Sequence, residues 1–275
     1  MPELPEVETV RRGLAPQMTA RTVRAVSLRV PALRWPIPEA LSDRIQGNPV
    51  HQVLRRGKYL LFEFASGWML IHLGMSGSLR WVGPELAVRK HDHMDLVFDH
   101  GILRLNDPRR FGAVLWHERS SGPIDSHPLL AKLGLEPLSI PAQQVGQWLY
   151  EGTRGRRSSI KAVLLAGDLV VGAGNIYACE SLFRARIHPA TQAGRLGLAR
   201  CQRLALAVRE TLLDALARGG SSLRDFVGSD GSSGYFQLDA LVYDRAGLTC
   251  RRCTGRIRRI VQQQRATFYC PACQH

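Results

Sequence analysis

The C-terminal stretch CRRCTGRIRRIVQQQRATFYCPAC, residues 250–273, decides how the end of this chain folds. It holds four of the six cysteines, Cys250, Cys253, Cys270 and Cys273, as two C-x2-C pairs separated by 16 residues. In a chain whose first residues do not form a secretory signal, this spacing predicts a Zn²⁺ site with four thiolate ligands rather than disulfides. The gap suits a β-hairpin, and so small a module needs the metal in order to fold. We therefore predict a zinc finger with one structural Zn²⁺.

The predicted finger is strongly basic, and so is the whole chain. Residues 250–275 contain six arginines and no acidic residue. Some of these arginines balance the charge of the thiolates, and the others leave a basic surface. Over 275 residues the formal net charge is +14, which indicates a polyanionic partner, with nucleic acid the first candidate.

The segments before the finger have a helical pattern of apolar residues. Three runs carry it: SSIKAVLLAG (158–167), NIYACESLFRARI (175–187) and LARCQRLALAVRETLLDALARGG (198–220). Serines precede the first run as helix caps, and two glycines are placed to end the third. Cys179 and Cys201 lie in these apolar surroundings and are interpreted as core residues. Residues 221–237 are rich in Gly and Ser, and we expect a mobile loop there.

Small residues precede the second helical run: Gly172, Gly174 and Asn175. Glycines let a phosphate approach the backbone, and a helix N-terminus favours an anion. Asn175 could cap the helix and donate its side-chain amide. An ordinary Gly-rich turn is the alternative interpretation, and positive charge upstream favours phosphate binding. That charge comes from Arg154, Arg156, Arg157 and Lys161.

The N-terminal half has a different period. After a helical pattern over residues 5–18, short β-rich runs follow at 22–30, 50–64, 67–82, 93–99, 101–106 and 112–117. Strands at this density predict a β-sandwich or barrel. Residues 131–150 lose the alternation, carry two prolines and are predicted as a hinge. The predicted domains are therefore 1–130, a hinge at 131–150, a helical domain at 151–247 and the finger at 248–275.

The N-terminus, MPELPEVETV, combines prolines with acidic residues. One interpretation is structural: Pro5 lies in the first turn of a helix and the acids favour its N-terminus. The other is chemical. Met1 is followed by a small residue, so we expect its removal, which leaves Pro2 with a free secondary amine. Pro2 would then be a nucleophile and Glu3 its acid/base partner.

Several motifs together resemble bacterial formamidopyrimidine-DNA glycosylases. They are MPELPEVETVRRGL at the start, HLGMSGSLR (72–80), KHDHMDL (90–96), DPRRFG (107–112), GAGNIYACESLF (172–183), HPA (188–190), DFVGSDGSSGYFQ (225–237) and QRATFYCPACQH (264–275). The resemblance runs over the whole chain in order. It implies an α+β, multidomain protein: an N-terminal β-sandwich with flanking helices, a helix-two-turns-helix domain and a C-terminal zinc finger. The implied activity is excision of oxidised purines from DNA, followed by strand cutting.

The resemblance also implies roles for individual residues. Pro2 matches the nucleophile, Glu3 the acid and Lys58 a lysine used in proton transfer. Arg265 and Asn175 match residues that bind phosphate at the lesion. The residues that fill the gap left by the extruded base match Met75, Arg109 and Phe111. DNA-contacting positions align with His91, Arg156 and Arg157, and Glu6 and Glu180 are candidates for supporting roles.

The chemistry explains why these residue types are needed. A base inside a duplex must be flipped out, and apolar wedges such as Met75 and Phe111 hold the gap open, although core packing is the alternative for both. A secondary amine that attacks sugar C1′ forms an iminium that stays cationic. This cation acidifies the neighbouring sugar C–H, so β- and δ-elimination can follow.

Three other classes are weighed against this one. A tautomerase with an N-terminal proline would be small, non-basic and without zinc. A non-catalytic DNA-binding relative would be expected to lose Pro2, Glu3 or Lys58. Endonuclease VIII prefers oxidised pyrimidines, and Leu4 and the long loop favour the purine enzyme. No apolar run approaches a membrane span, so we expect a cytoplasmic monomer that acts on double-stranded DNA.

Overall fold

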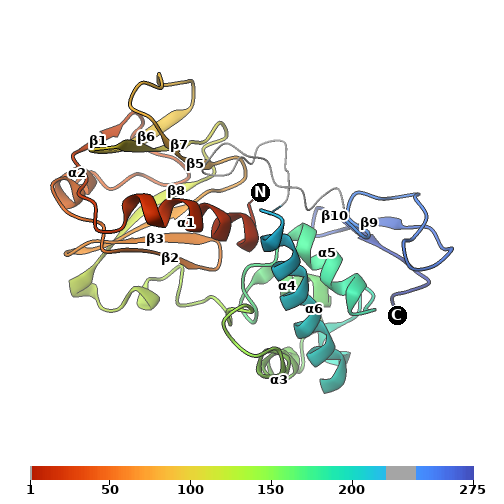
Figure 1. Ribbon diagram of the computed structural model, residues 1–275. Helices are drawn as coiled ribbons and strands as arrows, with labels where there is room; N and C mark the ends of the chain where they lie inside the picture. Colours follow the sequence, from red (N-terminus) through yellow and green to blue (C-terminus); the bar gives the residue numbers. More distant parts are fainter. Residues whose placement is uncertain (1, 221–239) are drawn as a thin grey trace. The chain divides into compact units, whose positions relative to one another are not determined.

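The computed structural model describes residues 2–220 and 240–275 (Figure 1). Residues 2–131 form one compact unit, and Lys132–Ala217 together with residues 240–275 form a second. The combination of helices and sheets confirms the predicted α+β class. Met1 and the Gly/Ser-rich loop predicted at 221–237 lie outside the described residues.

The first unit is a β-sandwich built on one long helix. Its helices are α1 (Leu4–Met18) and α2 (Leu41–Ile45). Its strands are β1 (Ala25–Leu28), β2 (Gln52–Arg56), β3 (Tyr59–Glu63), β4 (Gly67–His72), β5 (Ser78–Val82), β6 (Asp92–Phe98), β7 (Gly101–Asn106) and β8 (Ala113–Glu118). They form two antiparallel four-stranded sheets, in the orders β1-β6-β7-β5 and β2-β3-β4-β8.

One hydrophobic core joins both sheets to α1. Phe62 and Met69 reach it from one sheet, Met94 and Leu103 from the other. The apolar stripe of α1 completes the core: Val7, Val10, Leu14 and Met18. The helix predicted for residues 5–18 is confirmed. A helix of this length is only marginally stable in isolation, and burial of its apolar stripe stabilises it.

Two runs predicted as continuous β structure are interrupted by turns. Residues 50–64 form the β2–β3 hairpin, whose two-residue turn is Gly57–Lys58, and Gly57 has the positive φ of 58° that such a turn requires. Residues 67–82 divide into β4 and β5, which belong to different sheets. The first break lies in the charged stretch RRGK (55–58), and glycines mark the second, at Gly74 and Gly77.

The second unit contains four helices and a small sheet among its described residues. The elements are α3 (Ala142–Thr153), α4 (Ile160–Ala166), α5 (Asn175–Arg184), α6 (Leu198–Ala217), β9 (Arg258–Gln262) and β10 (Arg265–Tyr269). Short 3-10 turns occur at Arg119–Ser121 and Ile124–Ser126 in the first unit and at Ala193–Arg195 here. The three helices predicted from periodicity are present as α4, α5 and α6.

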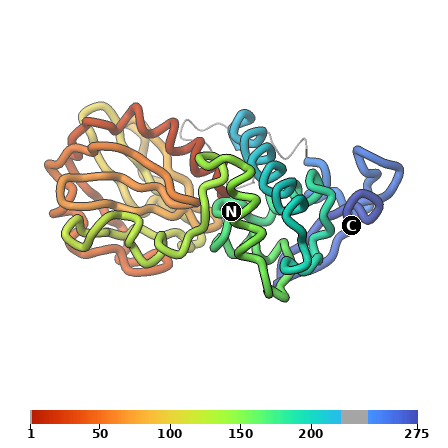
Figure 2. The backbone as a smooth tube through the Cα atoms, turned by 90° about the horizontal axis from the view of Figure 1, so that it is seen from below, coloured from red at the N-terminus to blue at the C-terminus, as the bar shows by residue number. Residues whose placement is uncertain are grey.

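The segment predicted as a hinge, 131–150, contains a helix that the sequence analysis missed. α3 begins at Ala142, directly after Pro141, and it packs along α6 (Figure 2). The two prolines indicated a break in the chain, but a proline before a helix is also a normal start signal. The apolar side of α3, with Val145 and Leu149, is buried.

The finger shares its core with α5 rather than building one alone. Phe183 and Cys179 of α5 cluster with Val242, Ile257 and Phe268. β9 and β10 pair antiparallel, as predicted for the gap between the cysteine pairs. Cys179 and Cys201 are both buried among apolar residues, in agreement with their predicted core role.

Candidate active site and nucleic-acid interface

The predicted nucleophile lies at the start of α1. Pro2 is buried, and Glu3 is only 2% exposed. Glu3 and Glu6 form a reciprocal cap: the Glu3 carboxylate accepts the Glu6 N–H, and the Glu3 N–H donates to Glu6 Oε2 at 2.8 Å. This cap fixes the carboxylate of Glu3, the residue that follows Pro2 in the chain. The structural interpretation of PELPE is therefore correct. The same cap orders the two residues that the chemical interpretation requires, Pro2 and Glu3.

Lys58 lies in the β2–β3 turn, and a buried chain of contacts connects this turn to α1. Arg55, whose side chain is 8% exposed, donates from Nε to Glu8 Oε2 at 3.1 Å and from Nη1 to the Gly57 carbonyl at 2.8 Å. Burial alone would raise the pKa of Glu8, but hydrogen bonds from Arg11 and Arg12 lower it to about 2. Glu8 is thus a fixed carboxylate that joins the helix behind Pro2 to the turn that carries Lys58.

His72, at the end of β4, was not among the predicted residues. It pairs with Tyr59 across the strands, and their rings lie 4.8 Å apart. Burial, with smaller contributions from the charges of Lys58 and Arg34, lowers its pKa to about 4, so the ring is neutral at pH 7. Nδ1 accepts the Gly74 N–H at 3.1 Å, which puts the ring proton on Nε2. A neutral N–H donor therefore lies within the electrostatic influence of Lys58.

The proposed wedge residues lie on two loops that touch. Met75 follows β4 and is 40% exposed, and Phe111 precedes β8 and is 45% exposed. The guanidinium of Arg109 lies 4.8 Å over the Phe111 ring. Gly74 has a φ of 64°, and a Cβ there would collide with the backbone of Phe111 and Gly112. Exposed apolar side chains on loops this close favour contact with a ligand over the core-packing alternative.

Asp107 holds these loops together and was missed by sequence reasoning. It is fully buried, and its carboxylate accepts from Ser76 Oγ and from the Gly112 N–H, both at 2.8 Å. Its N–H donates to the carbonyl of His91, and its carbonyl lies 2.9 Å from His93 Nε2. Only its place in the DPRRFG motif pointed to it, because its partners lie 5 to 31 residues away in the sequence. His91 is half-buried and has a positive φ of 71°.

In the second unit, Asn175 is the first residue of α5 and does not cap it; Gly174 occupies the cap position. The expectation that Asn175 caps the helix is therefore wrong. Its amide instead bridges to the finger: Nδ2 donates to the Ala266 carbonyl at 2.9 Å, and Oδ1 accepts from Lys161 Nζ at 2.6 Å. Lys161 is 1% exposed and also donates to Thr267 Oγ1 at 2.6 Å. The turn before α5 and strand β10 are thus fixed to each other.

The predicted phosphate-binding arginines differ in their surroundings. Arg265 is exposed at the start of β10, opposite Gln262. Arg156 forms an ion pair with Asp168, with Nη2 and Oδ2 2.8 Å apart, whereas Arg157 is exposed. Arg154, which the sequence grouped with them, lies 4.2 Å over the Tyr150 ring and donates to backbone carbonyls.

Glu180 anchors the finger to α5. It is 1% exposed, and its carboxylate accepts three backbone N–H groups, from Leu241, Val242 and Tyr243, at 2.8 to 2.9 Å. Its role is therefore to position the chain that enters the finger.

The four finger cysteines bring their sulfur atoms together in one cluster. Their sulfur atoms lie within 4.8 Å of one another, with separations such as 4.0 Å for Cys250–Cys273 and 3.6 Å for Cys253–Cys270. A Zn–S bond of about 2.3 Å in tetrahedral geometry gives sulfur separations of about 3.8 Å. The residues fit one structural Zn²⁺ with no position open for water, as predicted.

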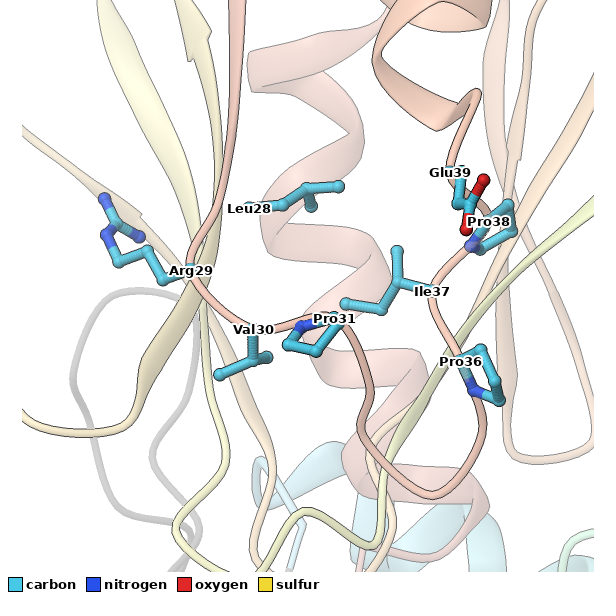
Figure 3. A pocket seen from close by; sticks show the side chains of 8 residues that line it. All are labelled: Leu28, Arg29, Val30, Pro31, Pro36, Ile37, Pro38 and Glu39. Carbon is cyan, nitrogen blue, oxygen red and sulfur yellow. The ribbon is translucent and has the colours of Figure 1, made fainter.

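A further concavity of about 460 Å³ in the first unit is separate from all these residues (Figure 3). It is lined by Leu28, Arg29, Val30, Pro31, Pro36, Ile37, Pro38 and Glu39. Its arginine, Arg29, is already paired with Asp95 at 2.5 Å. None of the predicted site residues lines it.

Family models and relatives match the chain along its length. Residues 1–114 match the formamidopyrimidine-DNA glycosylase N-terminal domain, residues 133–227 its H2TH domain, and residues 247–275 the zinc finger found in FPG and IleRS. The formamidopyrimidine-DNA glycosylase of Bordetella pertussis is 60% identical over 275 residues, covering 100% of this chain and 99% of the relative. That of Burkholderia multivorans is 59% identical, with both chains covered completely.

Solved structures agree. A Lactococcus lactis Fpg in complex with abasic-site DNA has a TM-score of 0.89 at 33% identity, with 99% of each chain covered. MutM in complex with DNA containing carbocyclic 8-oxo-G has a TM-score of 0.88 at 33% identity, with full coverage of both chains.

Together, the sandwich, the helical domain and the four-cysteine finger define the class of zinc-finger DNA glycosylases with a helix-two-turns-helix domain. Within that class, the chain belongs to the formamidopyrimidine-DNA glycosylase family. Among the helices in the described ranges, 2–220 and 240–275, none is long and apolar enough to span a bilayer.

Proposed function

We propose that this protein is a base-excision-repair DNA glycosylase that removes oxidised purines, chiefly 8-oxoguanine and formamidopyrimidines, and then cuts the strand as an abasic-site lyase. The observation that carries the proposal is the buried Pro2–Glu3 pair, fixed by the cap of α1, in a chain of this family. The solved relatives bound to abasic-site and 8-oxo-G DNA support the substrate class.

Pro2 nitrogen, freed by loss of Met1, attacks C1′ of the flipped nucleotide. The N–C1′ bond forms and the glycosidic bond breaks, so the base leaves with its electron pair and takes up the proton that the Pro2 nitrogen releases. Glu3 protonates the ring oxygen as the sugar opens, which gives the iminium. A C2′ proton is then lost, and β- and δ-elimination break the 3′ and 5′ phosphate bonds. Lys58 moves a proton during these steps.

The remaining residues position the DNA. Arg265 and Asn175 bind backbone phosphates without reading sequence, and His91, Arg156 and Arg157 add contacts to the backbone. Met75 and Phe111 fill the gap in the duplex, and Arg109 hydrogen-bonds the orphaned base.

Borohydride trapping tests the nucleophile. Processed protein incubated with 8-oxoguanine DNA and borohydride should become covalently linked through Pro2, because borohydride reduces the iminium to a stable amine. Glu3→Gln should lose excision of the intact lesion but keep some cutting of a ready-made abasic site, where no base has to leave. A cross-link that maps to a lysine in wild-type protein, or full activity of a chain that retains Met1, would refute the mechanism.

A second candidate function is removal of oxidised pyrimidines. One Lactococcus lactis Fpg structure contains DNA with an oxidised pyrimidine, at 33% identity and a TM-score of 0.90. Leu4 in the PELPE motif favours the purine enzyme. Faster excision of thymine glycol than of 8-oxoguanine from matched duplexes would reverse the assignment.

A further inference from the structure

A second concavity of the first unit lies behind the wedge loops. It has a volume of about 260 Å³ and is lined by Ser76, Ser78, Arg80, Arg89, Lys90, Asn106 and Pro108. We call it the β5–β7 pocket, because Ser78 and Arg80 belong to β5 and Asn106 ends β7. Ser76 directly follows Met75, and Pro108 directly precedes Arg109, so the pocket adjoins both loops proposed to enter DNA.

The pocket is cationic. Arg89 and Lys90 are exposed at its mouth, whereas the Arg80 side chain is 19% exposed. Arg80 Nε is buried and has no hydrogen-bond partner among the residues that the structure describes. This atom is not accessible in the pocket, so the accessible positive charge there comes chiefly from Arg89 and Lys90.

One buried carboxylate, that of Asp92, contacts three of the residues that line the pocket. Asp92, which has no exposed side-chain surface, accepts the Arg89 N–H at 2.7 Å and Asn106 Nδ2 at 2.9 Å, and it lies 3.6 Å from Arg80 Nη2. It also lies 3.8 Å from Arg104, which is itself held by Asp95. The wall is therefore built before any ligand arrives, and the net charge at the mouth stays positive.

We propose that the β5–β7 pocket binds a phosphodiester of the DNA backbone. This inference rests on the proposed function, because it requires DNA to reach Met75 and Arg109. The exposed side chains of Arg89 and Lys90 suit phosphate oxygens, and Arg80, which lies 3.6 Å from Asp92, adds positive charge to the wall. A duplex that touches the two exposed wedge side chains presents a phosphate about every 3.4 Å along each strand, so one falls beside the loops. A phosphate held there fixes the register of the backbone relative to the wedge.

The test combines a protein change with a DNA change. Binding to a duplex with one reduced abasic-site analogue is measured while single phosphates are replaced, one at a time, by neutral methylphosphonates. Arg89→Ala should weaken binding several-fold and reduce the salt slope by about 0.9. At one phosphate position, the methylphosphonate and Arg89→Ala should cost no more together than either does alone. Lys90→Ala should show a non-additive loss of affinity at the same phosphate position.

Arg24→Ala is the matched control. Arg24 is an exposed arginine of the same unit, outside the pocket, and its loss changes the net charge equally. Its effect should add to that of every methylphosphonate. If the loss of affinity from Arg89→Ala adds to that of the methylphosphonate at every position, the proposal is overturned. It is also overturned if inorganic phosphate stabilises the wild-type protein but not Arg89→Ala, while the variant shows no coupling to any phosphate of the duplex. If wild-type protein binds no abasic-site DNA at all, the proposed function fails rather than the pocket.

Discussion

At the scale of single residues, Arg55 makes the clearest prediction. It donates both to Glu8 behind the nucleophile and to the carbonyl next to Lys58. Arg55→Lys keeps the charge but cannot make both bonds, so the Lys58 turn should lose its fixed position. We expect excision of 8-oxoguanine to fall by about tenfold or more, consistent with the loss of roughly 1–2 kcal/mol of positioning, and abasic-site cutting to fall less.

Arg12 provides the control for this experiment. It binds the same Glu8 carboxylate at 2.9 Å, but its side chain is 60% exposed, and within the described residues its side-chain hydrogen bond goes to Glu8 and not to the turn. Arg12→Ala should leave the ratio of excision to abasic-site cutting unchanged. Equal losses in the two variants would mean that Arg55 only stabilises the fold.

The lowered pKa of His72 predicts how the free energy of unfolding depends on pH. Its folded pKa of about 4 lies below the usual 6.5, so between these values the unfolded chain binds a proton that the folded chain does not. The contribution is fully present above pH 6.5 and is lost as the pH falls towards 4, at a cost of up to about 3 kcal/mol. His72→Asn keeps an acceptor for the Gly74 N–H and cannot titrate. Chemical unfolding at several pH values should give a flatter curve for this variant; an unchanged slope would contradict the assignment.

At the scale of elements, the contact between the two wedge loops depends on Gly74. Gly74→Ala places a side chain at a positive φ, where it is strained by about 1–3 kcal/mol. The added Cβ also collides with the backbone of Phe111. Gly47→Ala adds the strain without the collision, because Gly47 also has a positive φ but no atom lies within 4 Å of its Cβ position. Both variants should be less stable, but only Gly74→Ala should slow excision, since only there must Met75 and Phe111 move apart. Activity measured per folded protein separates the two; comparable activities would refute this role of Gly74.

The elements also explain what the sequence could and could not predict. Helices with strong apolar periods, such as α1 and α6, and the spacing of the finger cysteines were predictable because their information is local. α3 was hidden by the prolines before it, whereas the β2–β3 turn was marked by Gly57 within the charged stretch RRGK. Asp107, Arg55 and His72 were not predictable, because their roles come from partners that only the folded chain brings near.

At the scale of the whole molecule, the metal holds part of the proposed DNA-binding surface. β10 supplies the carbonyl that binds Asn175 and the hydroxyl that binds Lys161. Removal of Zn²⁺ should therefore disorder both Arg265 and the Asn175 turn, while residues 2–131, which have their own core, stay folded. After chelation, affinity for abasic-site DNA should fall at least tenfold, and hydrogen exchange should accelerate in residues 240–275 but not in β2–β8. Exchange that accelerates equally in both units would contradict this independence.

The β9–β10 hairpin has a consequence for which changes in chain length the finger can tolerate. Its turn is only two residues, Gln263 and Gln264, with φ values of 48° and 60°. Side chains alternate between the faces of a strand, so one residue inserted between Arg265 and Cys270 would move that guanidinium to the opposite face relative to the second cysteine pair, while both C-x2-C pairs stayed intact. A one-residue insertion in this strand should therefore leave the zinc ligands able to bind the metal but displace the arginine that is proposed to bind phosphate. The distance along the chain from Arg265 to Cys270 is thus as restricted as a ligand spacing.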